Sequence, residues 1–241
     1  MSKYLLEIAA FTIDGVLHAI KGGADRIELC ENPQDGGTTP SYGMLQLLKR
    51  SVSIPVFPIV RPRGGDFVYS EMEFDIMKTD ILLCKELGYP GVVLGILNEK
   101  GEVDKERTTL LVSMAGSMQV TFHRAFDRTA DPFQALEDII ECGCTRILSS
   151  GQFPSANDGK ELLSSLVVTA GDRIIIMPGS GLNSDNVKGI ATFTKANEFH
   201  TAARKKVNGA SSPSTMNETL SAISVDEEEV RAIRSALDLL P

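Results

Sequence analysis

The feature that most constrains this chain is the regular alternation of short apolar runs with amphipathic helical patterns along its length. Eight runs have the length and residue types of β-strands: 5–10, 26–30, 56–62, 91–97, 119–125, 146–151, 173–179 and 197–203. Eight strand-then-helix units in 241 residues predict an α/β fold, a closed (β/α)8 TIM barrel of parallel strands. A doubly wound open sheet is the rival arrangement.

Capping signals mark where several helices begin and end. The predicted starts are Thr39 before Pro40, Ser70 with Glu73, Asp131 before Pro132, and Ser224 with Glu227. The second and third of these helices are predicted to end at Gly88 and Gly143, and the last at about Leu239. Residues 204–223 are rich in Ser, Asn and Gly and precede a single helix, which predicts an exposed mobile loop within one domain, 1–241.

Composition excludes some classes of protein. The chain has 24 Lys and Arg against 32 Asp and Glu, and a net charge of −8 argues against a general affinity for nucleic acid or anionic membranes. No run approaches the roughly 18 to 20 apolar residues of a membrane span, and the first residues do not resemble a signal peptide. The four cysteines, at positions 30, 84, 142 and 144, fit reduced thiols. We therefore expect a cytoplasmic protein.

The parity of polar residues within the strands predicts what faces the barrel interior. Side chains two apart share a face, and the outer face must be apolar because it packs on helices. Since active sites of TIM barrels lie at the carboxyl ends of the strands, His123 is expected to share a cavity there with Glu7, Glu28, Arg61 and His200. Arg124 and Asp127 are then expected at the rim. The alternative is an internal cluster of mutually neutralising charges.

Candidate roles follow from residue type. The predicted acid/base residues are Glu7, Glu28, His123 and Glu198. The predicted ligand-binding residues are Arg61, Arg63, Arg124, Ser150, Gly179, Gly181 and His200. Arginine suits carboxylate or phosphate, and the loop with Gly179 and Gly181 follows the seventh strand, where barrels often bind phosphate. The alternatives are an arginine pair that bridges Glu28 and Asp66, and a plain glycine turn capped by Asn183 or Ser184.

The cysteines offer softer donors. Cys142 and Cys144 precede the sixth strand at the opposite end of the barrel, where packing is a better interpretation than metal binding because no His or third Cys is near in sequence. Cys84 is expected on a helix. Cys30, at the end of the second strand, is the candidate metal ligand.

Several stretches together resemble the CutC copper homeostasis family. They are GGADRIELC (22–30), GGTTPSYG (36–43), VRPRGGDF (60–67), VTFHRAFD (120–127), RILSSG (146–151), MPGSG (177–181) and EFH (198–200). The resemblance implies a cytoplasmic (β/α)8 barrel that forms a dimer or larger homo-oligomer and handles copper, which in the family is associated with cysteines on the first two strands. Here the second strand has Cys30, but the first has Ala9 where some relatives have Cys.

The resemblance and the residues together leave three hypotheses. The first is a cytoplasmic CutC-family protein associated with copper homeostasis, with a copper ion as candidate ligand. The second is a TIM-barrel enzyme that acts on a small anionic substrate, bearing phosphate or carboxylate, at the carboxyl-terminal mouth of the barrel. The third is a sugar isomerase or epimerase that uses a divalent metal. Donor type distinguishes them, because copper(I) prefers thiolates and harder ions prefer carboxylate and imidazole.

Overall fold

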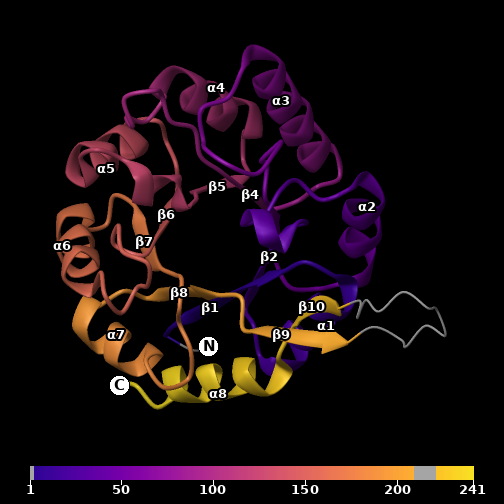
Figure 1. Cartoon of the computed structure of the whole chain (residues 1–241), viewed down its shortest axis with the longest axis vertical. Coiled ribbons are helices and arrows are strands. Elements are labelled where there is room, and N and C mark those ends of the chain that lie inside the picture. Colours follow the sequence, from indigo (N-terminus) through magenta and orange to yellow (C-terminus); the bar gives the residue numbers. More distant parts are fainter. Residues whose placement is uncertain (1–2, 209–220) are drawn as a thin grey trace, which may run out of the picture.

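The computed structural model describes residues 3–208 and 221–241, and its strands form the closed ring of a barrel (Figure 1). The eight barrel strands are β1 Leu5–Ala10, β2 Arg26–Leu29, β3 Val56–Pro58, β4 Gly91–Leu94, β5 Gln119–Phe122, β6 Arg146–Ser149, β7 Ile175–Pro178 and β8 Glu198–Thr201. They pair in parallel in the orders β3-β2-β1-β8 and β4-β5-β6-β7. Parallel bridges between Ile59 and Val93, and between Gly179 and His200, join the two sets. The predicted (β/α)8 barrel is confirmed.

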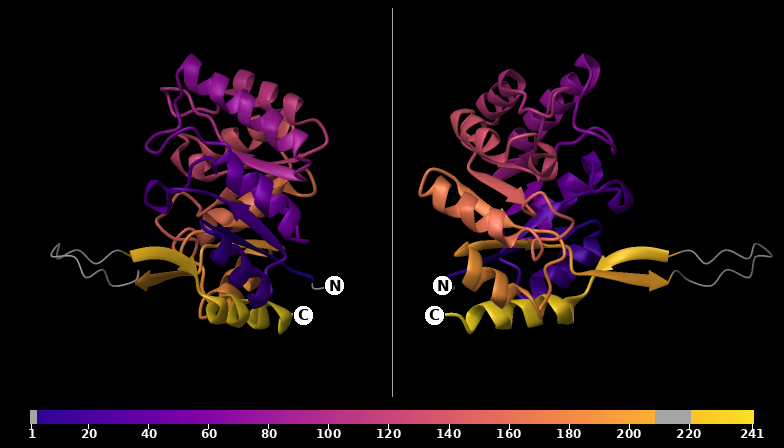
Figure 2. Two further views of the ribbon diagram at one scale, coloured as in Figure 1. Left: turned by 90° about the vertical axis from the view of Figure 1, so that its right-hand side faces the viewer. Right: turned by 60° about the vertical axis from the view of Figure 1, so that its left-hand side comes forward.

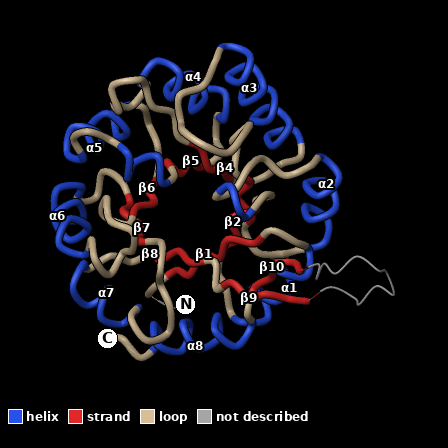
Figure 3. The backbone as a smooth tube through the Cα atoms, in the orientation of Figure 1, coloured by secondary structure: helices blue, strands red, loops and turns tan. Residues whose placement is uncertain are grey.

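Helices form an outer ring around the strands (Figure 3). They are α1 Ile13–Gly22, α2 Tyr42–Ser51, α3 Glu71–Glu86, α4 Lys105–Ala115, α5 Pro132–Glu141, α6 Lys160–Ala170, α7 Val187–Thr194 and α8 Glu227–Asp238. Outward-facing strand residues such as Leu6, Ile27 and Phe122 are fully buried against these helices. The parity prediction therefore holds for the outer faces, because a strand covered by helices must be apolar there.

The helix signals were confirmed in part. Ser70 and Glu73 form the predicted capping box of α3, and Asp131 caps α5 with Pro132 in its first turn. Helix α2 starts two residues later than predicted, because Ser41 rather than Thr39 accepts the capping hydrogen bond.

Several strands are shorter than predicted. Strand β3 ends at Pro58, after which Ile59 contributes only an isolated bridge, and β5 ends at Phe122. A 3-10 helix, η2 (Arg124–Arg128), follows directly, with His123 at its cap. A second 3-10 helix, η1 (Pro33–Asp35), lies in the loop after β2. These loops carry polar residues from the strand ends to the mouth of the barrel.

The prediction of an irregular loop over 204–223 is wrong at both ends. Residues Arg204–Asn208 form β9 and Ser221–Val225 form β10, and the two pair antiparallel in a hairpin that projects from the barrel (Figure 2). Residues 209–220 of the predicted loop lie outside the described residues. Because Ser224 belongs to β10, the predicted capping box with Glu227 does not form, and Asp226 caps α8 instead.

In the two described stretches, no helix has both the length and the apolar character needed to cross a bilayer.

Candidate functional site

A network of charged side chains fills the amino-terminal end of the barrel. Arg26 begins β2, and its guanidinium bonds the carboxylates of Glu7 and Glu198, the latter at 2.6 Å. Arg146 begins β6 and donates to Glu198 from Nε at 2.7 Å and from Nη2 at 3.2 Å. Both guanidiniums also lie over the ring of Phe57. We call the four charged residues Glu7, Arg26, Arg146 and Glu198 the barrel floor.

The barrel floor contains two of the predicted acid/base residues. Burial opposes the charged form of Glu7, but the charge of Arg26 and the hydrogen bond from His200 outweigh it and lower its pKa to about 2. Glu198 is shared between two arginines, and neither glutamate lines the cavity above. For this pair the alternative interpretation, an internal ion-pair cluster, describes the structure better than acid/base chemistry.

Sequence reasoning missed the two arginines of the floor. Arg26 has the same strand parity as Glu28, so it could have been placed inside the barrel, and Arg146 occupies the corresponding first position of the sixth strand.

His200 connects the floor to the space above it. Its Nδ1 lies 2.9 Å from Glu7 Oε1, and its Nε2 lies 3.5 Å from Glu28 Oε2. Burial favours the neutral ring, but the hydrogen bond to Glu7 and the charge of Glu28 raise the pKa of His200. Burial also raises the pKa of Glu28. Glu28 and His200 thus compete for one proton, which makes Glu28 the glutamate best suited to exchange protons with a ligand.

Above His200 the barrel opens into a cavity of about 1250 Å³ at the carboxyl ends of the strands. The predicted site residues that line it are Glu28, Arg61, His123, Arg124, Gly181 and His200. Among the described residues, those predicted for the site but found outside the lining are Glu7, Cys30, Arg63, Ser150, Gly179 and Glu198. The cavity lies where TIM barrels place their active sites.

His123 is buried on the cavity wall, with 4% of its surface exposed. Its Nδ1 accepts a hydrogen bond of 3.2 Å from the backbone N–H of Ala125, so the neutral ring carries its proton on Nε2. Burial and the nearby charge of Arg61 lower the pKa of His123 to about 3. This side chain is therefore a neutral hydrogen-bond donor at physiological pH.

Arg61 and Arg63 form hydrogen bonds and ion pairs within the protein that differ from those predicted. The terminal nitrogens of Arg61 donate to the backbone carbonyls of Asp35, Gly37 and Gly65 at 2.6 to 2.8 Å. Arg61 lines the cavity, but its two terminal nitrogens already join the loops after β2 and β3. Arg63 lies outside the lining and pairs with Asp66 and Glu73. The alternative of an arginine bridge is thus correct for Asp66 and Arg63, whereas Arg61 forms no ion pair with Glu28.

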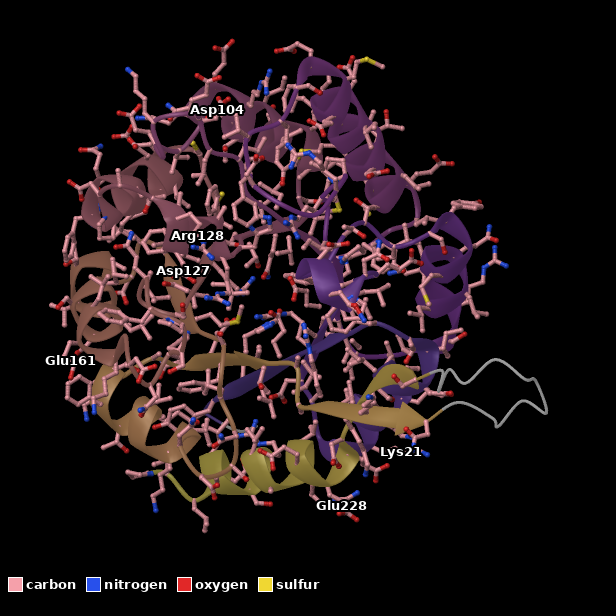
Figure 4. The ribbon with its side chains drawn as sticks, in the orientation of Figure 1. Lys21, Asp104, Asp127, Arg128, Glu161 and Glu228 are labelled. Atoms are coloured by element: carbon pink, nitrogen blue, oxygen red, sulfur yellow. The ribbon has the colours of Figure 1, made fainter. Side chains whose placement is uncertain are left out.

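Asp127 organises the rim of the cavity. Its carboxylate accepts hydrogen bonds from Ser149 Oγ, from the backbone and side chain of Ser150, and from Arg124 Nε. Figure 4 labels Asp127 and Arg128 on the inner side of the helix ring, and Arg128 lines the cavity. Arg124 and Ser150 were both predicted to bind ligand. Ser150 is fully buried in this arrangement, so only Arg124 lines the cavity.

The glycine loop after β7 combines packing with access to the cavity. A Cβ at Gly179 would lie 2.4 Å from Leu148 Cδ1, so a larger residue here would require the Leu148 side chain to move. Gly181 lines the cavity with φ +70° and adopts a backbone conformation that glycine favours. In the next turn, Asn183 accepts from the N–H groups of Asp185 and Asn186. Phosphate binding at this loop stays a prediction.

Cys30, Cys84 and the pair Cys142 and Cys144 lie in three separate parts of the barrel. Cys30 is 1% exposed in a cluster with Phe57, Ile59 and Val93, and burial together with the neighbouring Glu28 raises the pKa of its thiol well above the usual value. All four cysteines are free and buried. Within residues 3–208 and 221–241, no group of three or more His, Cys, Asp or Glu side chains has an arrangement that could hold a metal ion. Two thiolates, which copper(I) prefers, are not brought together at Cys30.

Comparison with known proteins identifies relatives over most of the chain. The model of the CutC family matches residues 4–205. A CutC family protein of Chromobacterium violaceum is 47% identical and covers 97% of this chain and 98% of its own. The human copper homeostasis protein cutC homolog is 46% identical over 83% of this chain and 74% of its own. The crystal structure of a CutC protein from Streptococcus agalactiae superposes with a TM-score of 0.79 at 33% identity, covering 83% of this chain and 98% of that one. The chain therefore belongs to the CutC family.

Proposed function

We propose that this protein takes part in copper homeostasis. The observation that carries the proposal is 46% identity, over 83% of this chain, to a human protein named for that role. The cytoplasm is the compartment we propose, because four free, buried thiols suit a reducing environment. We also propose a homodimer, as expected from the family resemblance, which light scattering of the purified protein would test.

Direct copper binding is the weaker part of this proposal, and we expect low affinity. Cys30 is enclosed by apolar side chains, and the first strand has Ala9 where the family resemblance would place a second cysteine. Cys84 lies on α3, and Cys142 and Cys144 lie before β6, so neither region can supply a second thiolate without refolding. A competition titration against a chromophoric copper(I) chelator, without oxygen, should show weak binding that Cys30→Ser removes. One tightly held copper per chain that depends on Cys30 would contradict this expectation.

A second function is favoured by the cavity lining: an enzyme that acts on a small anionic substrate. Among the described residues, no Cys or Met lines the cavity, whereas Glu28, Arg61 and His123 do. Glu28, with its raised pKa and its contact to His200, is the candidate acid/base residue. The guanidinium of Arg61 and the N–H of His123 would then face the substrate's negative charge.

One complementation experiment tests both functions. A bacterial strain that lacks its own CutC should change its growth under copper stress, and expression of this chain should restore it. If copper binding is the activity, Cys30→Ser fails to restore growth and Glu28→Gln succeeds. If cavity chemistry is the activity, the outcomes are reversed, with copper affinity unchanged in Glu28→Gln. No effect of the wild-type chain on copper tolerance would refute the proposed role.

A further inference from the structure

Two buried hydrogen-bond donors on the cavity wall have no acceptor. His123 Nε2 and Arg61 Nε are both shielded from solvent and form no hydrogen bond of good geometry. The buried Tyr69 hydroxyl interacts with the Arg61 guanidinium but likewise forms no hydrogen bond of good geometry, so His123 Nε2 is the stronger of the two observations. The proton of His123 is on this nitrogen, because Nδ1 accepts from Ala125. A buried donor without a partner costs about 1 to 3 kcal/mol, so the fold retains both groups against its own stability. Such groups are explained when a ligand supplies the missing acceptor.

The ring of Phe67 lies beside both donors. Its centroid is 4.9 Å from that of the His123 imidazole and 4.9 Å from the Arg61 guanidinium carbon. Phe67 is itself only half-buried and lines the same cavity. Its backbone is fixed, since its carbonyl accepts from the N–H of Leu97 at 2.9 Å. A rotation of the Phe67 side chain would therefore leave the backbone of this loop in place.

We propose that Phe67 covers a subsite in which a carboxylate or carbonyl oxygen of a small carboxylic acid accepts hydrogen bonds from His123 Nε2 and Arg61 Nε. The inference rests on the second proposed function and specifies its substrate class. Arg61 is the cation that presents one of the two donors, and His123 is neutral. One carboxylate with a single negative charge matches these two donors, whereas a phosphate dianion would need a second cation of the cavity lining, such as Arg124 or Arg128, to pair its second charge. The ring moves aside when the acid enters.

Histidine NMR tests this directly, because the chain has only three histidines. In 15N-labelled protein, His123 should show the Nε2–H tautomer at neutral pH. Addition of acetate, lactate or pyruvate should shift the His123 Nε2 signal saturably and leave that of His18 unchanged. Sodium chloride at equal ionic strength is the control. No shift of His123 with any of the three acids overturns the proposal. A shift with phosphate alone overturns the substrate class.

Two variants separate the subsite from general anion binding. Phe67→Ala should bind the same acid about two- to fivefold more tightly, because the cation–π contact with Arg61 no longer has to be broken. His123→Phe, which keeps the ring but loses the N–H, should bind about tenfold or more weakly. His18→Gln is the matched control on α1 and should bind as the wild type does. Should His123→Phe not fold, Phe67→Ala and the NMR shifts still decide. If acids bind equally well to all variants, an anion site exists but not this one, so the proposed anionic substrate survives and this inference fails.

Discussion

The barrel floor and the cavity above it contain similar residues but differ in how their polar groups are paired. Every charge of the floor has an opposite charge in contact, with Glu198 held by both Arg26 and Arg146. In the cavity, His123 Nε2 has no partner, and Glu28 contacts His200 at 3.5 Å. Burial of charge is therefore a poor sign of function in this fold. The absence of an internal partner is the better sign, because a paired group has nothing left to offer a ligand.

The largest expected effect comes from breaking the floor. Glu198→Gln leaves Arg146 buried with a neutral partner and Arg26 with Glu7 as its remaining carboxylate, so we expect the free energy of unfolding to fall by about 3 to 5 kcal/mol. The control is Glu137→Gln, which weakens the exposed bidentate pair with Arg173. There we expect a loss of about 1 kcal/mol or less. Urea denaturation measures both. Equal losses for the two variants would show that the floor does not depend on its charges.

The sequence predicted which strand residues face inward, but it did not separate floor from cavity. Parity alone placed Glu28 and Glu198 on the inner face. Their different roles depend on register, because β8 pairs with β1 so that Leu5 lies opposite Glu198 and Glu7 opposite His200. That stagger lowers Glu198 to the level of Arg26 and Arg146. Contacts across the barrel between β6 and β8 cannot be derived from spacing within one strand.

The hairpin was missed for a different reason. The segment RKKVN of β9 has no alternation of apolar and polar residues, and all five of its residues are exposed. A strand whose side chains are all exposed leaves no periodic apolar signal in the sequence, so composition predicted a loop. Capping signals were reliable where the Ser or Asp side chain was free to cap, as at Ser70 and Asp131. They failed at Ser224, which the hairpin had already placed in a strand.

An intermediate effect is expected at the two arginines after β3. Arg61 is 4% exposed and joins the loops after β2 and β3 through three backbone carbonyls. We therefore expect Arg61→Ala to lower the free energy of unfolding by about 2 kcal/mol. Arg63→Ala, which removes exposed pairs with Asp66 and Glu73, should cost about 1 kcal/mol or less. Thermal denaturation compares them, and the reverse order would mean that the loops hold together without Arg61.

The last expected difference between the floor and the cavity depends on pH. The folded state holds His123 neutral with a pKa of about 3, whereas the unfolded chain titrates near 6.5. Below pH 6.5, His123 binds a proton in the unfolded state but not in the folded state. The free energy of unfolding therefore falls as the pH drops toward 3. Between pH 7 and pH 5 this amounts to about 2 kcal/mol.

Other groups titrate in the same experiment. His200 and Glu28, whose pKa values are raised, change the stability with the opposite sign, and Glu7 lowers the stability between about pH 4.5 and pH 2. The contribution of His123 is therefore measured as a difference between two proteins. In urea titrations, the free energy of unfolding should fall between pH 7 and pH 5 by about 2 kcal/mol more for the wild type than for His123→Phe. Equal losses would mean that His123 accepts a proton in the folded state, and it could then not serve as the neutral donor that distinguishes the cavity from the floor.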